Sequence, residues 1–244
     1  MIKFSEMRIS VVPLLLMLLL IMASTASAFP GSSDDLPPVE TVLDRMKTHE
    51  EWQDRHLLEY QVRRTFYAAN ARFNLDSTLE VKTVFKKPNS FDSEIVRTEG
   101  SKMIREKVFD KILEAEKDAR TKEAKATAIT PENYFFSMIG AETCDGRSCY
   151  RMRIVPKRKD RFSVDGQIWV DAEDGAIARI QGSPAKRPSL WTLHTEIDRR
   201  YKKIDGAWLC EEMQSKSDIL IGGHSTLKVD HSYTSVVTQK QSGS

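Results

Sequence analysis

The chain has 244 residues, a formal net charge of +2 and 30% charged residues. This nearly neutral balance excludes nucleic-acid binding by bulk charge, and it also excludes an acidic, solvating protein. Hydrophobic residues make up 40% of the chain, enough for the core of one sizeable domain. We therefore expect a globular domain whose function depends on a particular site or surface.

The N-terminal segment predicts export. Lys3 and Arg8 precede an apolar run over residues 11–22, and residues 26–28 read Ala-Ser-Ala, the small side chains that signal peptidase accepts. The run is shorter than the roughly 20 residues that a spanning helix needs. The sequence therefore predicts a signal peptide over residues 1–28, cleaved after Ala28, and a periplasmic protein. An uncleaved membrane anchor is the alternative.

Helical and strand patterns follow a linker over residues 29–38. Apolar residues recur at helical spacing from Val39, which predicts an amphipathic helix over residues 39–58. From Tyr60 to Gly100 the apolar period changes to two, as is typical of long antiparallel strands. Residues 101–126 return to helical spacing beneath a strongly charged opposite face, and after Leu113 the apolar stripe fades.

Beyond Pro131 the chain reads as strands separated by Asp-Gly and Gly-Gly turn signals. We predict a mainly-β α+β fold: a strongly curved antiparallel sheet, or half-open β-barrel, with two or three helices covering its concave side. The ligand-binding domain should span residues 39–237, and residues 238–244 should form a disordered tail. The predicted strands cover residues 133–143, 149–158, 163–173, 176–183, 190–204, 207–219 and 223–237.

Three cysteines fit an exported protein. Cys144 and Cys149 flank the turn signal Asp145-Gly146, and two strands leaving that turn would set the cysteines opposite each other. The spacing predicts a disulfide between them. Cys210 has no evident partner, and we interpret it as a small buried side chain.

Catalytic motifs are sparse. The hairpin over residues 165–186 carries Asp171, Glu173 and Asp174, but their spacing suits turn chemistry better than acid–base work. His49 and His56 share a helix face without HExxH spacing, and no nucleophile elbow or P-loop occurs. We predict no enzyme, no cofactor and no metal site. A hydrolase that uses Asp171 or His231 is the least favoured hypothesis.

Large side chains on one face of many strands must be covered by the protein's own helices or by a ligand. A packed core beneath the two helices is one interpretation, and a cavity for an acyl chain is the other. The candidate cavity-lining residues are Tyr60, Val62, Arg64, Phe66, Leu79, Val81, Phe85, Trp191, Leu193, Ile197, Leu227, Val229 and Tyr233.

Basic clusters occupy residues 156–161, 185–188 and 198–203. They are interpreted as solubilising loops and strand ends, or alternatively as a rim that meets anionic lipid head groups or an acidic partner. No aromatic residues are interleaved to stack bases, so no nucleic-acid partner is expected.

The order of these features resembles the LolA-like periplasmic lipoprotein carriers, the outer membrane lipoprotein-sorting protein superfamily. The resemblance rests on "YQVRR" (60–64), "IWVDAEDGAIARIQG" (168–182) and "IDGAWLCEEM" (204–213), and covers roughly residues 39–237. It implies a hydrophobic cavity for lipoprotein acyl chains or other lipids, with Arg64 as a candidate polar contact and Arg63 competing for that role.

Two function classes follow from the resemblance. The first is a periplasmic carrier that binds lipoprotein acyl chains or another lipid. The second is an envelope sensor or interaction module that uses the same fold without carrying cargo. In either case we expect a monomer whose protein partner lies in the inner or outer membrane.

Overall fold

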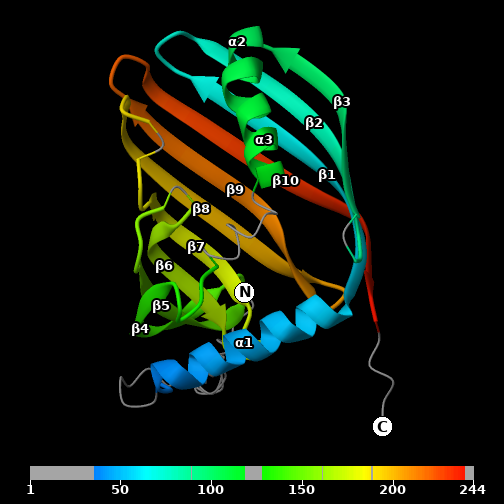
Figure 1. The fold of residues 1–244 in the computed structure, drawn as a ribbon, viewed down its shortest axis with the longest axis vertical. Helices are drawn as coiled ribbons and strands as arrows, with labels where there is room; N and C mark the ends of the chain where they lie inside the picture. The colour runs from blue at the N-terminus through cyan, green and yellow to red at the C-terminus, as the bar shows by residue number, and fades with distance from the viewer. Residues whose placement is uncertain (1–35, 89, 119–127, 161, 188, 240–244) are drawn as a thin grey trace, which may run out of the picture. The chain divides into compact units, whose positions relative to one another are not determined.

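The computed structural model describes residues 36–239 except 89, 119–127, 161 and 188 (Figure 1). The predicted signal peptide, most of the linker and most of the C-terminal tail lie outside the described residues. No helix in the described part of the chain combines the length and the apolar character that a membrane span requires.

Most helices and strands begin and end within a few residues of the predicted positions. The helical elements are α1 (Val39–His56), α2 (Lys102–Ile104), the π-helix η2 (Arg105–Phe109) and α3 (Asp110–Asp118). The strands are β1 (Leu57–Asn70), β2 (Leu75–Lys86), β3 (Ser90–Gly100), β4 (Tyr134–Cys144), β5 (Arg147–Pro156), β6 (Val164–Asp171), β7 (Ile177–Pro184), β8 (Thr192–Ile204), β9 (Ala207–Ile219) and β10 (Gly223–Thr238).

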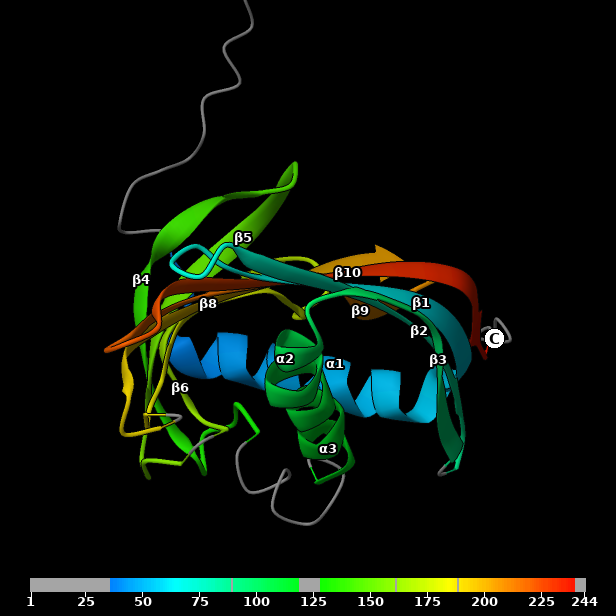
Figure 2. The ribbon, with the colours of Figure 1, turned by 90° about the horizontal axis from the view of Figure 1, so that it is seen from above.

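All ten strands belong to one sheet of order β3-β2-β1-β10-β9-β8-β7-β6-β5-β4, and every pair is antiparallel. The predicted mainly-β α+β class is confirmed. The prediction of a strongly curved half-open barrel holds only in this coarser form, because the sheet is open and β3 and β4 remain its two edges. Figure 2 shows the helices on one side of this sheet.

We call the side of the sheet that bears the helices the helix face. The strand register lines up one row of its side chains across nearly the whole sheet, because Cα partners in antiparallel strands point to the same side. Every member of the row is apolar except Arg199. In sheet order the row reads Leu79, Phe66, Val229, Met213, Arg199, Ile180, Ile168, Met152 and Met138.

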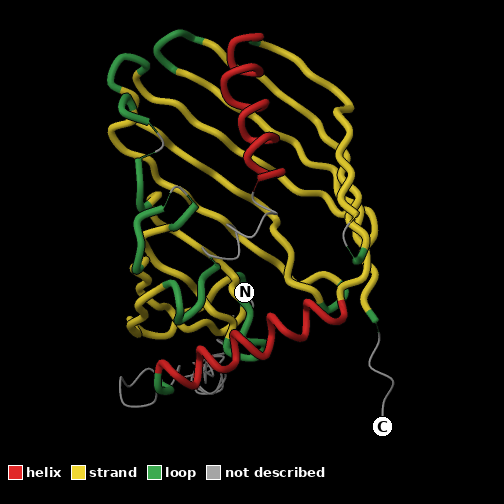
Figure 3. The backbone as a smooth tube through the Cα atoms, in the orientation of Figure 1, coloured by secondary structure: helices red, strands yellow, loops and turns green. Residues whose placement is uncertain are grey.

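Two separate hydrophobic clusters fix the helices to this face. Val42 of α1 packs with Met152, Ile154 and Ile168, over the half of the sheet formed by β4 to β7. The other cluster lies over β1, β2 and β10, where Ile104 and Phe109 pack against Phe66, Leu79 and Val81. Figure 3 shows the two helical segments, in red, well apart along the sheet. The middle of the helix face, on β8 and β9, therefore lies between the two clusters.

The segment from α2 to α3, residues 102–118, begins at a defined cap. The Ser101 side chain accepts a hydrogen bond from the backbone N–H of Ile104, which satisfies one unpaired donor of the first turn. The described helix reaches Asp118, so the end of the helix predicted over residues 101–126 lies outside the described residues.

Candidate functional site

The hairpin between β6 and β7 holds a carboxylate cluster at the end of the sheet near α1. Asp171 is 1% exposed and accepts two hydrogen bonds from Arg147, Nε to Oδ2 at 2.5 Å and Nη2 to Oδ1 at 2.9 Å. Its Oδ1 also accepts from the backbone N–H groups of Glu173 and Asp174. Asp171 therefore closes the turn and binds an arginine at the same time.

The carboxylate of Asp174 likewise accepts several hydrogen bonds. It accepts from Lys203 Nζ and from Trp208 Nε1, each at 2.9 Å. Burial alone would raise the pKa of Asp171 and of Asp174, but hydrogen bonds from Arg147 to Asp171, and from Lys203 and Trp208 to Asp174, outweigh it and hold each pKa below its usual value. A general acid at neutral pH needs the opposite change, so neither carboxylate is suited to that role.

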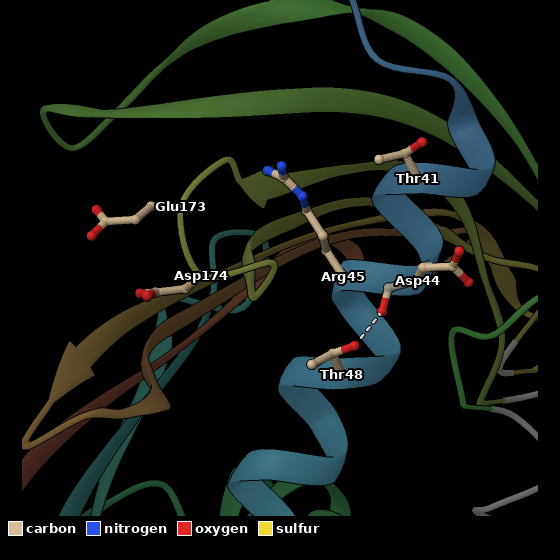
Figure 4. A pocket seen from close by; sticks show the side chains of 6 residues that line it. All are labelled: Thr41, Asp44, Arg45, Thr48, Glu173 and Asp174. Atoms are coloured by element: carbon tan, nitrogen blue, oxygen red, sulfur yellow. Dashed lines mark hydrogen bonds between the residues drawn. The ribbon is translucent and has the colours of Figure 1, made fainter. Parts of the chain in front are cut away.

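The groove beside this cluster is polar. It measures about 520 Å³ and is lined by Thr41, Asp44, Arg45 and Thr48 of α1 together with Glu173 and Asp174 (Figure 4). Arg45 Nη1 donates to Ala172 O at 2.8 Å, while Asp44 points away from the hairpin in Figure 4. These contacts dock α1 on the hairpin and leave no convergent reactive groups among the lining residues.

Close backbone approach explains the glycine in this turn. Gly175 has φ of 72°, and a Cβ there would lie 2.6 Å from the carbonyl oxygen of Arg45. Gln53 adds a two-way bond to β9, donating to Trp208 O and accepting from Trp208 N. The "DAEDGA" segment is thus the platform on which α1 rests.

The hydrolase hypothesis named Asp171 or His231, and the sheet separates these two residues. His231 lies on β10 and Asp171 on β6, four strand positions apart. Neighbouring strands are about 4.8 Å apart, so roughly 19 Å separates the two backbones. The two residues therefore do not form an acid–base pair. Among the described residues no three His, Cys, Asp or Glu side chains gather as a metal site.

Most of the predicted cavity-lining residues lie on the helix face. The register places Tyr60, Val62, Arg64 and Phe66 beside Phe85, Val81 and Leu79 of β2 and beside Tyr233, Val229 and Leu227 of β10. Ile197 of β8 lies on the same face and is half-buried.

Trp191 and Leu193 do not join this face. Their exposed fractions are 58% and 49%. The register of β8 against β9 shifts between Thr192 and His194, so Thr192 and Thr195 are buried in their place. Strict alternation in the sequence could not reveal this irregularity.

The helix face over β1 and β2 is filled by the protein's own side chains. Ile104 and Phe109 pack there against the sheet, and Phe109 is fully buried. A smaller hollow, of about 190 Å³, lies elsewhere, between β7 and β8, where Ser183, Thr192 and His194 contribute to its lining. The sequence left open a packed core or a cavity for an acyl chain. Over β1 and β2 the structure has the packed core.

Polar side chains nevertheless lie on the helix face beside this packed cluster. Arg64 is 6% exposed, and its Nη1 donates to Glu116 Oε1 of α3 at 2.6 Å. Its guanidinium lies over the Phe66 ring, 5.2 Å from the centroid. Its Nε and Nη2 have no hydrogen-bond partner among the described residues, and the same holds for Nδ1 of His231. His231 is the Cα partner of Arg64 on β10.

Arg199 adds a second cation to the same region. Its Nη2 donates to Met213 Sδ at 3.5 Å, a weak acceptor. Burial, and then the charges of Arg64 and Arg199, lower the pKa of His231 to about 4. The imidazole is therefore neutral at neutral pH, in a strongly positive environment. The sequence made Arg64 a candidate lining residue, whereas Arg199 lay in the basic run 198–203 and His231 was considered only for a hydrolase.

The cysteines depart from the predicted geometry. The turn is the two residues Asp145-Gly146, so Cys144 pairs with Arg147 while Cys149 pairs with Glu142. The two cysteines are thus diagonal neighbours, and the structure has Cys144, Cys149 and Cys210 as free thiols. Burial, followed by its hydrogen bond to Cys144, raises the pKa of the Cys149 thiol. Their pairing stays a prediction.

Comparisons with known proteins give structural matches only. No family model and no curated protein matches the chain. A DUF1329 family protein from Desulfovibrio piger is 13% identical with a TM-score of 0.44, over 85% of this chain and 96% of that one. A putative outer membrane lipoprotein-sorting protein domain from Vibrio parahaemolyticus is 12% identical with a TM-score of 0.44, over 84% and 94%.

A LolA superfamily protein from Nitrosomonas europaea is 10% identical with a TM-score of 0.38, over 84% of this chain and 95% of that one. All three of these solved structures are less than 15% identical to the chain, with TM-scores below 0.5. At these TM-scores the similarity defines no function, and the functional argument rests on the chain's own residues.

Proposed function

We propose that the protein is an exported carrier that holds the acyl chain of a lipoprotein or another lipid against the β1, β2 and β10 part of the helix face. One observation carries the proposal. This apolar surface is covered by the short segment 102–118, whose buried anchors include Ile104 and Phe109. A lipid would take the place of that segment, and the sheet would curve further around it towards the half-open barrel that the sequence predicts.

Simple energetics support the exchange. Exposing Ile104 and Phe109 costs about 1.5–3 kcal/mol for each side chain. Each methylene of a bound chain contributes about 0.8 kcal/mol, so roughly four to eight methylenes offset the loss at these two residues. The partly buried Val108, Ile112 and Leu113 add to the cost, and further methylenes are needed to offset it. A longer acyl chain leaves a net gain. A sufficiently long acyl chain can therefore displace the segment 102–118 without a cavity that is already open.

One end of the sheet suits loading at a membrane. Leu190 is 94% exposed and Trp191 58% exposed in the segment before β8, and Leu220 and Ile221 are 57% and 61% exposed in the β9–β10 turn. The Leu220 N–H donates to Trp191 O, which joins the two segments. Exposed apolar clusters of this kind favour contact with a membrane or a protein partner.

The test is lipid capture by the full chain. After expression with its own N-terminus, protein from the periplasmic fraction should begin at Phe29 and contain a co-purified lipid by native mass spectrometry. Delipidated protein should bind a fluorescent fatty acid or a diacylated lipopeptide. A folded, delipidated protein that binds neither would refute the carrier function.

A sensor function is the second candidate, favoured by the edge strand β3. Ile95 and Val96 are 52% and 50% exposed there, and a partner strand could add to such an edge. In that case a lipid-free protein should form a discrete complex with an envelope protein, and Ile95→Lys should abolish it. If β3 can be changed without effect on any complex, the sensor function loses its support.

A further inference from the structure

The part of the helix face from β1 to β8 contains more positive charge than nearby carboxylates compensate. Arg199 interrupts a row of otherwise apolar side chains, and Arg64 enters the next row two residues along β1 from Phe66. Burying a cation without a partner is costly, so proteins normally pair such groups. Among the described ion pairs, Arg64 has Glu116 and Arg199 has none. Arg199 has the Tyr201 side chain as a neutral hydrogen-bond partner, and the Glu116 charge also acts on it.

The unpartnered atoms of Arg64 form a specific recognition edge. Nε and Nη2 lie on the same side of the planar guanidinium and donate in parallel, the arrangement that binds a carboxylate or a phosphate in bidentate fashion. In this structure Glu116 uses Nη1 and leaves that edge without a partner among the described residues. The side chain is more than nine-tenths buried, so few competing waters can reach it.

The second cation can reach the same anion. Arg64 on β1 and Arg199 on β8 are separated by β10 and β9, which is about 14 Å between backbones. Two extended arginine side chains on one face can converge over that span. Both charges act on His231, which lies on β10 between them. Both guanidinium groups therefore lie within electrostatic reach of His231.

We infer that Arg64 and Arg199 bind the anionic head group of an amphipathic ligand, a carboxylate or a phosphate, and that Glu116 occupies part of this site in the present structure. The inference rests on the proposed carrier function and specifies its ligand class. When the head group binds, it displaces the Glu116 carboxylate, and α3 loses its ion pair to the sheet. The apolar chain then lies along Phe66 and Val229, where the segment 102–118 had packed.

Matched amphiphiles test the site. The full chain, delipidated, would be titrated calorimetrically with dodecanoate, dodecyl phosphate, 1-dodecanol and inorganic phosphate. We expect at least one anionic amphiphile to bind about 10-fold or more tightly than the alcohol, since a charged hydrogen bond contributes about 1.5–3 kcal/mol. The tighter of the two anions identifies the head group. Equal affinity for the alcohol and both anions would overturn the inference.

Neighbouring arginines supply the control variants. Arg64→Gln and Arg199→Gln should each weaken anion binding about 10-fold and leave dodecanol binding unchanged. Arg63→Gln and Arg200→Gln should behave like the unmodified chain, because Arg63 and Arg200 are 59% and 45% exposed and pair with Glu80 and Asp198. Equal losses from Arg63→Gln and Arg64→Gln would mean that general charge, and not this site, attracts the anion.

Glu116 provides a test that does not disturb the core. Its side chain is 34% exposed, so Glu116→Gln should fold normally. Removing the competing carboxylate should tighten anion binding several-fold, and weaker binding would contradict the displacement. If no amphiphile binds, the carrier function is refuted. The titration with inorganic phosphate then tests the anion site on its own. Phosphate binding that Arg64→Gln abolishes would support the site, and no phosphate binding would overturn it.

Discussion

Arg147 and Arg64 both lie on strands of the same sheet, yet their guanidinium groups have opposite surroundings. Arg147 donates to Asp171, Glu173 and Asp174. Arg64 donates to Glu116 and leaves two nitrogens without a partner in the described chain. A saturated arginine network fixes structure, whereas an unsaturated one retains capacity to bind an anion. The comparison therefore separates the structural end of the sheet from its candidate ligand site.

The largest loss of stability is expected when the network around Arg147 is broken. Asp171→Ala leaves Arg147 without its main partner and frees two turn N–H groups in a buried place. We expect a loss of about 3–5 kcal/mol in the free energy of unfolding, measured by urea denaturation. Glu173→Ala, at a side chain that is 79% exposed, should cost less than about 0.5 kcal/mol. Similar losses in both variants would contradict the network.

The second prediction concerns the pH dependence of stability, and it applies to the region around Arg64 and His231. Burial and the charges of Arg64 and Arg199 lower the pKa of His231 to about 4, from 6.5 in the unfolded chain. Below pH 6.5 the unfolded state binds a proton that the folded state does not, so stability falls as pH decreases towards 4. The loss should reach roughly 3 kcal/mol. His231→Gln should flatten the stability curve in this window, and an unchanged slope would contradict the low pKa.

The turn beneath α1 gives a smaller effect. Gly175→Ala places a Cβ against the Arg45 carbonyl at a positive φ, and we expect a loss of about 2 kcal/mol in thermal unfolding. Gly146→Ala also has a positive φ, 80°, but meets nothing within 4 Å. It should cost about 1 kcal/mol. If the two variants lose the same stability, close packing of α1 on Gly175 is not important.

The smallest effect should have the opposite sign. Arg64→Met replaces a buried cation with unpaired donors by an apolar side chain of similar length. Stability should stay unchanged or increase by up to about 1 kcal/mol, since an apolar replacement of a buried ionic group is often neutral or stabilising. Urea denaturation measures this directly. A large destabilisation would show that the Arg64–Glu116 pair is structural, as at Arg147.

Local turn chemistry made much of the fold predictable. Asp145-Gly146 and Asp205-Gly206 adopt positive φ at both residues, as a two-residue hairpin requires. Each dipeptide therefore marks a hairpin at the residue level. The carboxylate hairpin was likewise identified as a turn, although its Arg147 partner comes from a neighbouring strand and depends on register.

The site was predictable only in part, because single irregularities change which side chains face the helices. Alternation on β1 made Arg64 a candidate lining residue, and the register places it on the helix face. On β8 the register shift near Leu193 moved that residue and Trp191 outwards. Arg199 lay in a run that resembled a solvated strand end, and pairing with Met213 and Ile180 reveals its inward direction.

The segment 102–118 is attached very differently at its two ends. Near its start, Ser101 donates its N–H to Asp76 O and Gly100 packs against the backbone of Asp76, so this end is tied to β2. At the far end Glu116 pairs with Arg64, one turn beyond Ile112 and Leu113, which are only partly buried against the sheet. A helical rise of about 1.5 Å per residue puts these points roughly 20 Å apart. The segment can therefore swing about its fixed end at Ser101 once the ion pair of Glu116 is broken. An anion that displaces Glu116 acts at the end of the segment that moves farthest.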